Sequence, residues 1–151
     1  MFKRSNRGFT LIELLVVIAI IGILSAVVLA SLNTARSKGN DAAIQSDLTG
    51  IRTQAAIYYA DHNNYGPTEV AVVSDCTTGG SNVFSDATIQ NQIAGALKAN
   101  NNGDIVCNVS ADGKAFAASA VLSSVSTSYF CVDSTGMGTT TTTALGTNTS
   151  C

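Results

Sequence analysis

The sequence predicts an α+β fold, in which one long N-terminal α-helix packs on a small antiparallel β-sheet. Three observations predict it: an uncharged apolar run over residues 14–32, a helix-period apolar face over residues 44–62, and short strand-like runs in the second half. A chain of 151 residues is long enough for one globular domain after such a run. We therefore expect the boundary between the apolar segment and the globular domain near residue 32.

The apolar run has the length of a membrane span. It reads LLVVIAIIGILSAVVLASL, and its nineteen residues would form a helix about 28 Å long, close to the thickness of a bilayer's hydrocarbon core. Lys3, Arg4 and Arg7 precede it, and no acidic residue comes before Glu13. This asymmetry predicts a cytoplasmic N-terminus and a single pass, with the rest of the chain outside. A secretory signal peptide would be shorter, whereas an ordinary signal anchor is an alternative.

Glu13 stands at the edge of this run. A carboxylate in hydrocarbon costs a few kcal/mol, so it needs a partner or a role. A simple anchor would gain nothing from it. Glu13 therefore favours a segment that does more than hold the chain in a membrane.

The residues around Glu13 resemble a known processing site. Gly8-Phe9-Thr10-Leu11-Ile12-Glu13, followed by LLVVIAIIGIL, is similar to the junction of type IV prepilins and type II secretion pseudopilins. Those families have a basic leader that ends in Gly, then Phe, with Glu five residues into the mature chain. The resemblance covers about residues 1–60. It implies a leader over residues 1–8, a transmembrane and filament-core half of the long helix over 9–32, and an extracytoplasmic globular domain of the pilin fold over 33–151.

The resemblance also implies a function and its partners. A prepilin peptidase would cut between Gly8 and Phe9, and the new Phe9 amine would be N-methylated. The chain would be a structural subunit of a type IV pilus or pilus-like filament, in which Glu13 and a neighbour's Phe9 amine neutralise each other during assembly. Its partners would be identical or related subunits in a helical homopolymer, the peptidase and methylase, and an inner-membrane assembly platform.

Several alternatives to a major pilin are open. The same motif fits a type II secretion pseudopilin, which builds a periplasmic piston, or a minor pilin. The precursor would reside in the inner (cytoplasmic) membrane, and the assembled form would be an extracellular pilus or a periplasmic filament. From another class, the chain could be a lone membrane-anchored binding module. The run also departs from major pilins, since it has Gly22 but no proline and carries Ala30 where that proline would fall. Melting of the core helix in a filament is therefore open.

After the run, the pattern becomes that of an amphipathic helix. Apolar residues recur at steps of three and four, as on one helix face: Ile44, Leu48, Ile51, Ala55, Tyr58 and His62. Asp47, Arg52 and Gln54 lie opposite this face. We predict one helix from about Thr10 to about His62, ended by the breakers in residues 63–67. Tyr58, Tyr59 and His62 are interpreted as packing residues.

The second half of the chain predicts a short helix and a meander. Residues 85–99 have a helical apolar face, with Ser85 as the expected N-cap. Residues 100–103, with three asparagines and a glycine, predict a turn. Three strands are expected over residues 104–109, 115–122 and 128–132. By the resemblance, residues 69–84 would join the long helix to the sheet. The Thr- and Gly-rich tail, 138–151, would be floppy on its own.

The four cysteines predict disulfides. They all follow the apolar run, their number is even, and no two of them have the spacing of a zinc or redox motif. Four cysteines allow three connectivities. The favoured one joins Cys131 to Cys151, which would tie down the tail, and Cys76 to Cys107.

Other function classes have little support. The formal net charge is -2, which gives no basic field for nucleic acid. With one histidine, His62, the chain offers no catalytic constellation, so we expect no enzyme and no catalytic residue. No cofactor and no metal site are expected. Calcium is open at Asp104, Asp112 and Asp133, where loop capping is the favoured role.

Overall fold

The computed structural model describes residues 8–66, 76 and 81–151. It divides the chain into two compact units, Met1–Arg36 and Ser37–Cys151. Most of the connection expected over residues 69–84 lies outside the described residues.

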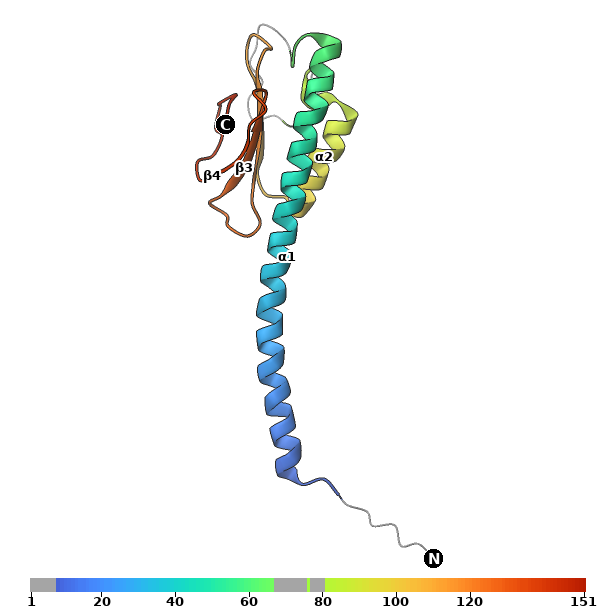
Figure 1. Cartoon of the computed structure of the whole chain (residues 1–151), viewed down its shortest axis with the longest axis vertical. Coiled ribbons are helices and arrows are strands. Elements are labelled where there is room, and N and C mark those ends of the chain that lie inside the picture. The colour runs from blue at the N-terminus through green and yellow to red at the C-terminus, as the bar shows by residue number, and fades with distance from the viewer. Residues whose placement is uncertain (1–7, 67–75, 77–80) are drawn as a thin grey trace, which may run out of the picture. The chain divides into compact units, whose positions relative to one another are not determined.

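The long helix has the extent that the sequence predicts. α1 spans Leu11–His62 and passes Gly22 and Ala30 without a break (Figure 1). It ends where Asn63 adopts the left-handed conformation, with φ of 58°, and its N–H donates to the carbonyl oxygen of Tyr59 at 2.7 Å. Asparagine accepts this conformation more readily than most residues, so the local sequence itself ends the helix.

The second unit contains a four-stranded antiparallel sheet in the order β1-β2-β3-β4. β1 spans Ile105–Val109, β2 Phe116–Val121, β3 Tyr129–Asp133 and β4 Gly138–Thr141. The first three strands and their meander are confirmed, and with them the α+β class. The left-handed conformations of Asn101 and Asn102 form the turn that leads into β1.

β4 is a correction, because the sequence predicts no strand in the tail. Its residues pair with β3, with Thr139 opposite Cys131 and Thr140 opposite Phe130. The ladder consists of backbone hydrogen bonds, which need no apolar alternation, and β-branched threonine suits a strand. A search for alternating apolar residues therefore misses this strand.

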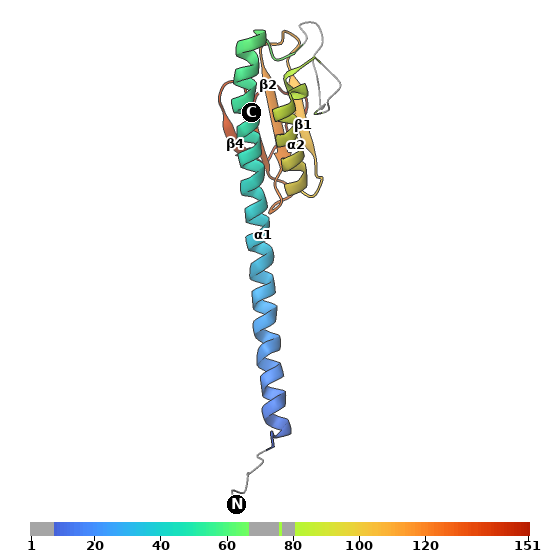
Figure 2. The same ribbon diagram turned by 90° about the vertical axis from the view of Figure 1, so that its right-hand side faces the viewer.

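Both helices of the second unit cover one face of the sheet. α2, Ala87–Ala99, lies beside the second half of α1 over the sheet (Figures 1 and 2). The expected face of α1 is buried here, since Ile44, Leu48, Ile51 and Ala55 are all 0% exposed. The largest side chains of the core are Phe84, Phe116, Ile44, Leu48, Ile51 and Ile89. Burial of this face holds the helix on the sheet.

The start of α2 differs from the expectation. Ser85 is not its N-cap but the last residue of a short 3-10 helix, Val83–Ser85. Asp86 caps α2, because its Oδ1 accepts from the backbone N–H groups of Thr88 at 2.9 Å and Ile89 at 3.1 Å. Asp and Ser are equally good caps, so the sequence could not choose between two neighbours.

The face of α1 opposite the predicted one is also partly covered. A Cβ added to Gly95 of α2 would lie 2.6 Å from Oδ2 of Asp47, and one added to Gly50 would lie 2.4 Å from Nε2 of Gln92. Glycine thus lets the two helices approach closely. Gln54, also from this side, lies 3.5 Å from the capping carboxylate of Asp86. These polar side chains face α2 rather than open solvent.

The aromatic end of α1 is only partly a packing site. Tyr58 and Tyr59 are half-buried against the core, whereas His62 is exposed and stacks on Tyr58 with 4.0 Å between ring centroids. The interpretation of His62 as a core residue is therefore wrong. It lies in the last turn of α1, where its side chain is exposed.

Candidate functional site

The junction of Gly8 and Phe9 lies just before α1. The Phe9 side chain is 86% exposed, and a Cβ added to Gly8 would meet nothing within 4 Å. The fold of the chain therefore does not itself require glycine at position 8. A requirement for glycine there would have to come from another molecule that binds the junction.

Thr10 and Glu13 form a capping box at the start of α1. The backbone N–H of Thr10 donates to Oε2 of Glu13 at 2.9 Å, and its hydroxyl donates to the same oxygen at 2.7 Å. In return, the backbone N–H of Glu13 donates to Oγ1 of Thr10 at 3.2 Å. This exchange satisfies N–H groups that the first turn of a helix leaves unpaired.

The capping box gives Glu13 a role that the sequence reasoning missed. The signal was present, since Thr-x-x-Glu before an apolar run is a helix-start pattern. A carboxylate near a helix N-terminus is also favoured by the helix dipole. Glu13 therefore has a local partner within the single chain, even though a lone anchor was expected to gain nothing from it.

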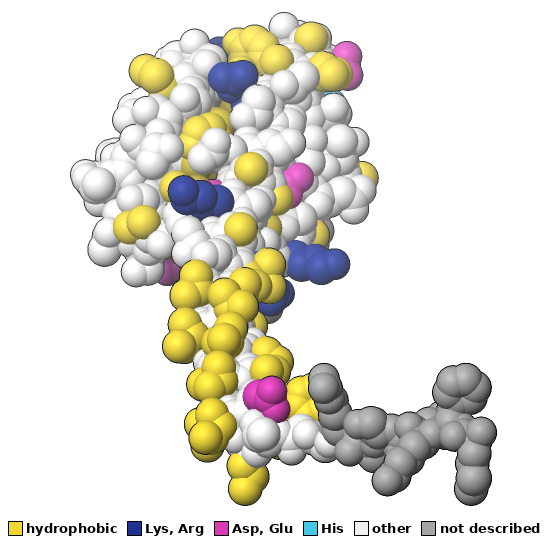
Figure 3. Space-filling view, turned by 60° about the horizontal axis from the view of Figure 1, so that its bottom comes forward, with side chains coloured by type: hydrophobic (Ala, Val, Ile, Leu, Met, Phe, Trp, Pro, Cys, Tyr) yellow, Lys and Arg dark blue, Asp and Glu magenta, His cyan; other side chains and the backbone are white. Residues whose placement is uncertain are grey.

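The residues that follow the capping box carry an unburied apolar surface. Leu11 is 85% exposed and Ile12 76%, and every described residue up to Arg36 is exposed. Hydrophobic side chains cover this part of α1 in the space-filling view (Figure 3). Within the described residues, α1 is the one helix whose length and composition suit a membrane span. In water, such a surface needs a lipid or protein partner.

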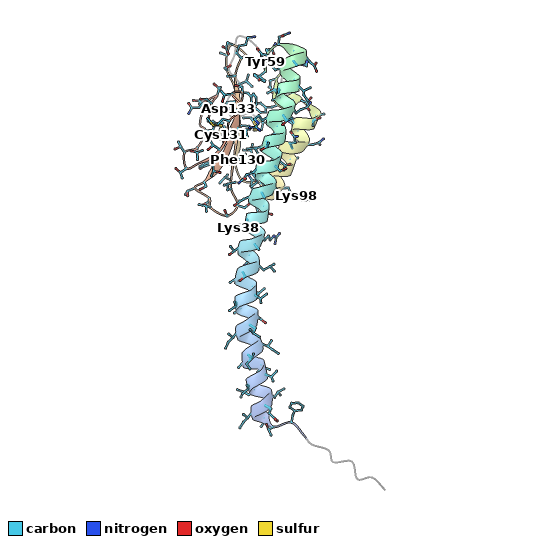
Figure 4. All side chains as sticks on the ribbon, in the orientation of Figure 1. Lys38, Tyr59, Lys98, Phe130, Cys131 and Asp133 are labelled. Atoms are coloured by element: carbon cyan, nitrogen blue, oxygen red, sulfur yellow. A yellow bond between two sulfur atoms is a disulfide. The ribbon has the colours of Figure 1, made fainter. Side chains whose placement is uncertain are left out.

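The structure contains two disulfides. Cys76 is joined to Cys107 with an S–S distance of 2.04 Å, and Cys131 to Cys151 with 2.11 Å. This is the connectivity that the sequence analysis favours. The first bond ties the segment before α2 to β1, and the second ties Cys151 to β3, where Figure 4 labels Cys131.

The tail covers the outer face of the sheet, away from the helices. Leu145 is buried there in a small cluster with Ala117 and Cys131. The amide nitrogen of the buried Asn108 donates to the carbonyl oxygens of Gly146 at 2.9 Å and Asn148 at 2.7 Å. The tail is therefore held by packing and hydrogen bonds as well as by its disulfide.

Asp133 links this tail to β3. Its Oδ1 accepts from the N–H and hydroxyl of Thr135 and from the N–H of Met137, and its Oδ2 accepts from the N–H of Cys151 at 2.9 Å. Burial raises the pKa of this carboxyl, but these hydrogen bonds, Thr135 foremost, outweigh burial and lower the pKa. Both carboxylate oxygens of Asp133 thus accept hydrogen bonds from the turn after β3 and from Cys151.

Asp112 has a similar role in the turn between β1 and β2. It accepts from the hydroxyl of Ser110 and the N–H of Lys114, and these hydrogen bonds lower its pKa. In residues 8–66, 76 and 81–151, no group of three or more His, Cys, Asp or Glu side chains could hold a metal ion. The expectation of no cofactor, with calcium left open at Asp104, Asp112 and Asp133, stays untested.

Comparison with known proteins identifies the class of the N-terminal segment. The family model of the prokaryotic N-terminal methylation motif matches residues 3–29, which include the Gly8–Phe9 junction, the capping box and most of the apolar run. The chain thus carries the prepilin motif, and the resemblance is confirmed.

The relatives are pilus and secretion-system components. The chain is 42% identical over 71 residues to the type IV wide pilus major component PilA4 of Thermus thermophilus, which is 47% of this chain and 54% of that protein. It is 36% identical over 69 residues to the type II secretion system core protein G of Klebsiella michiganensis, 46% of this chain and 49% of that protein. It is 35% identical over 101 residues to a fimbrial protein of Neisseria meningitidis, 64% of this chain and 58% of that protein.

The extent of these matches limits what they show. The chain spans about half the length of the curated relatives it matches first, 54% and 49%. It is homologous to type IV pilins and to type II secretion core proteins G over that length. No solved structure matches the chain.

Proposed function

We propose that the chain is the structural subunit of a type IV pilus or pilus-like filament. A prepilin peptidase cuts it between Gly8 and Phe9, the new Phe9 amine is methylated, and α1 then brings subunits together. One observation carries the proposal. The processing junction stands directly before a helix whose apolar surface is exposed in the single chain.

The exposed apolar surface requires two successive environments. As a precursor, the chain resides in the inner membrane with a single pass, because the apolar run matches the hydrocarbon core in length and the basic leader lies before it. In the filament, the same surface is buried against the α1 helices of neighbouring identical or related subunits. An assembly platform in the inner membrane moves the subunit from the first environment to the second.

Glu13 changes partner in this transfer. In the single chain, its carboxylate accepts hydrogen bonds from Thr10. Cleavage creates an ammonium group at Phe9, and in the filament Glu13 of one subunit neutralises the Phe9 amine of another. A subunit docked in the wrong register would leave two charges unpaired in an apolar bundle, which is costly. The pair therefore sets the axial register.

A pseudopilin is the second candidate function, favoured by the similarity to core protein G of the type II secretion system. A minor pilin is the third. All three share cleavage, membrane insertion and assembly through α1, and none is an enzyme. They differ in where the filament lies, outside the cell or in the periplasm.

Mass spectrometry of assembled protein tests the proposal. Intact mass should correspond to a chain that begins at Phe9 and carries a methyl group. Gly8→Val should block cleavage, while Asn6→Val in the same leader should not. Shearing the cells should release filaments with this chain as main protein if it is a pilin. Assembled protein that retains residues 1–8 contradicts the proposal.

A further inference from the structure

We infer that the end of the second unit at which α1 enters it is a docking surface for anionic phospholipid headgroups. The surface consists of Lys38 on α1, Lys98 in the last turn of α2, and the loop that joins β2 to β3, which includes Val125. The inference rests on the proposed membrane insertion of the precursor and goes beyond it, because it assigns a lipid class to a surface of the globular unit.

Two hydrogen bonds bring these residues to one place. The backbone N–H of Ser124 donates to Oδ1 of Asp41 at 3.1 Å, so the loop contacts α1 one turn after Lys38. The hydroxyl of Ser123 donates to the carbonyl oxygen of Ala99 at 2.7 Å, so the same loop contacts the end of α2 beside Lys98. Figure 4 shows Lys38 and Lys98 at this end.

Positive charges outnumber negative ones among the exposed side chains of this surface. Lys38 and Lys98 are both exposed, and within residues 8–66, 76 and 81–151 neither takes part in a hydrogen bond or an ion pair. Two carboxylates lie nearby. Asp41 is only 8% exposed and is held by Ser124, whereas Asp104 is exposed. The surface therefore presents two exposed ammonium groups against one exposed carboxylate, an excess of positive charge.

The surface also has the right position along α1. Lys38 lies 38 − 32 = 6 residues after the apolar run, about 9 Å along a helix. Headgroup regions extend about 5–8 Å beyond the hydrocarbon core on each side. The ammonium of Lys38 can thus reach the phosphates. Val125, 48% exposed, adds an apolar side chain in the same loop.

The occupant follows from the charge. Lysines near a membrane attract anionic lipids at short range, and zwitterionic lipids give no such field. Lys114 is the internal control, because it lies at the other end of the unit. There it donates to the carbonyl oxygen of Asn63 at 2.9 Å, just after the C-terminus of α1.

Lysine footprinting tests this surface on the full chain in nanodiscs. The chain is incorporated into phosphatidylcholine discs and into discs that also contain phosphatidylglycerol, and lysines are acylated with a water-soluble active ester. Acylation of Lys98 should be about five-fold slower in the anionic discs, and 0.5 M salt should abolish the difference. Lys114 should react equally in both. Equal rates for Lys98 in both discs overturn the inference, whereas failure to enter either disc contradicts the proposed function.

A charge reversal provides the second measurement. In Lys98→Glu, acylation of Lys38 in anionic discs should rise toward its rate in phosphatidylcholine discs. The matched variant Lys114→Glu should leave it unchanged. If Lys38 stays equally protected in Lys98→Glu, the globular unit does not dock through this surface. Absence of free thiols before reduction confirms that each variant has formed its disulfides.

Discussion

The capping box makes it possible to separate two roles of Glu13 by substitution. Glu13→Gln keeps a side-chain oxygen that can accept from the N–H of Thr10, because glutamine also serves at this position of a capping box. It removes the charge that would neutralise a neighbour's Phe9 amine. Thr10→Val does the reverse, since it removes the hydroxyl and keeps the carboxylate.

The two losses differ in size. Loss of a helix N-cap costs about 1 kcal/mol, or about five-fold in an equilibrium constant. Removal of one partner from a buried ion pair costs about 3–5 kcal/mol, which is more than a hundredfold. Glu13→Gln should therefore nearly abolish filaments, whereas Thr10→Val should reduce them modestly. Glu13→Ala should combine both effects.

The assay compares membrane and filament pools in cells that express only the variant. Immunoblots should show normal amounts of each variant in the membrane, since loss of the Glu13 charge or of the Thr10 hydroxyl makes the segment more apolar. Sheared filaments are then measured from the same cells. Normal filament yield from Glu13→Gln together with loss in Glu13→Ala would show that Glu13 acts as a helix cap and not as an ionic partner. Normal yield from both would refute each role.

Three further predictions concern the second unit, each measured by urea unfolding of the full chain in detergent. Replacing Cys131 and Cys151 by serine should lower the free energy of unfolding by about 3 kcal/mol, and thiol labelling of the unreduced parent should find no reactive cysteine. Gly95→Ala should lower the free energy of unfolding by about 1–3 kcal/mol, because its Cβ would lie 2.6 Å from Oδ2 of Asp47. Gly39→Ala is the control and should be neutral or stabilising, because its Cβ would meet nothing within 4 Å. Equal effects of the two substitutions would contradict this prediction. Burial raises the pKa of Asp47, so the charged carboxylate destabilises the fold at pH 7 and Asp47→Asn should raise the free energy of unfolding there. This gain should disappear below about pH 4, where the parent carboxyl is protonated. A gain independent of pH would contradict the prediction.

The sequence predicted those parts of the protein whose signals are local. The membrane-length run, the junction of Gly8 and Phe9, and the buried face from Ile44 to Ala55 all follow from composition, motif or helical period. The end of α1 at Asn63 is equally local, because asparagine accepts the left-handed conformation. The capping box of Thr10 and Glu13 was readable too, and was missed because Glu13 was considered as a charge and not as a cap.

Other features depend on contacts between residues far apart in the chain. Strand β4 forms because the backbone of Thr139 and Thr140 pairs with that of β3, and no apolar pattern in the tail predicts that pairing. The packing of α2 on α1 depends on Gly95 lying opposite Asp47, 48 positions earlier in the chain (95 − 47 = 48). Neither glycine nor aspartate shows by itself which partner it will meet.

The sequence by itself therefore determined a helix of membrane-spanning length that carries the prepilin motif, followed by a disulfide-containing α+β domain. Only the tertiary structure decided how the cysteines pair and what the tail does. Cysteine pairing depends on Cα separations, here 5.1 Å and 5.8 Å, which sequence spacing does not contain. The tail lies on the outer face of the sheet because Leu145 packs in an apolar cluster there. Asn108 also donates hydrogen bonds to two carbonyl oxygens of the tail. Local patterns specify helices and spans, whereas folding in three dimensions brings such partners together.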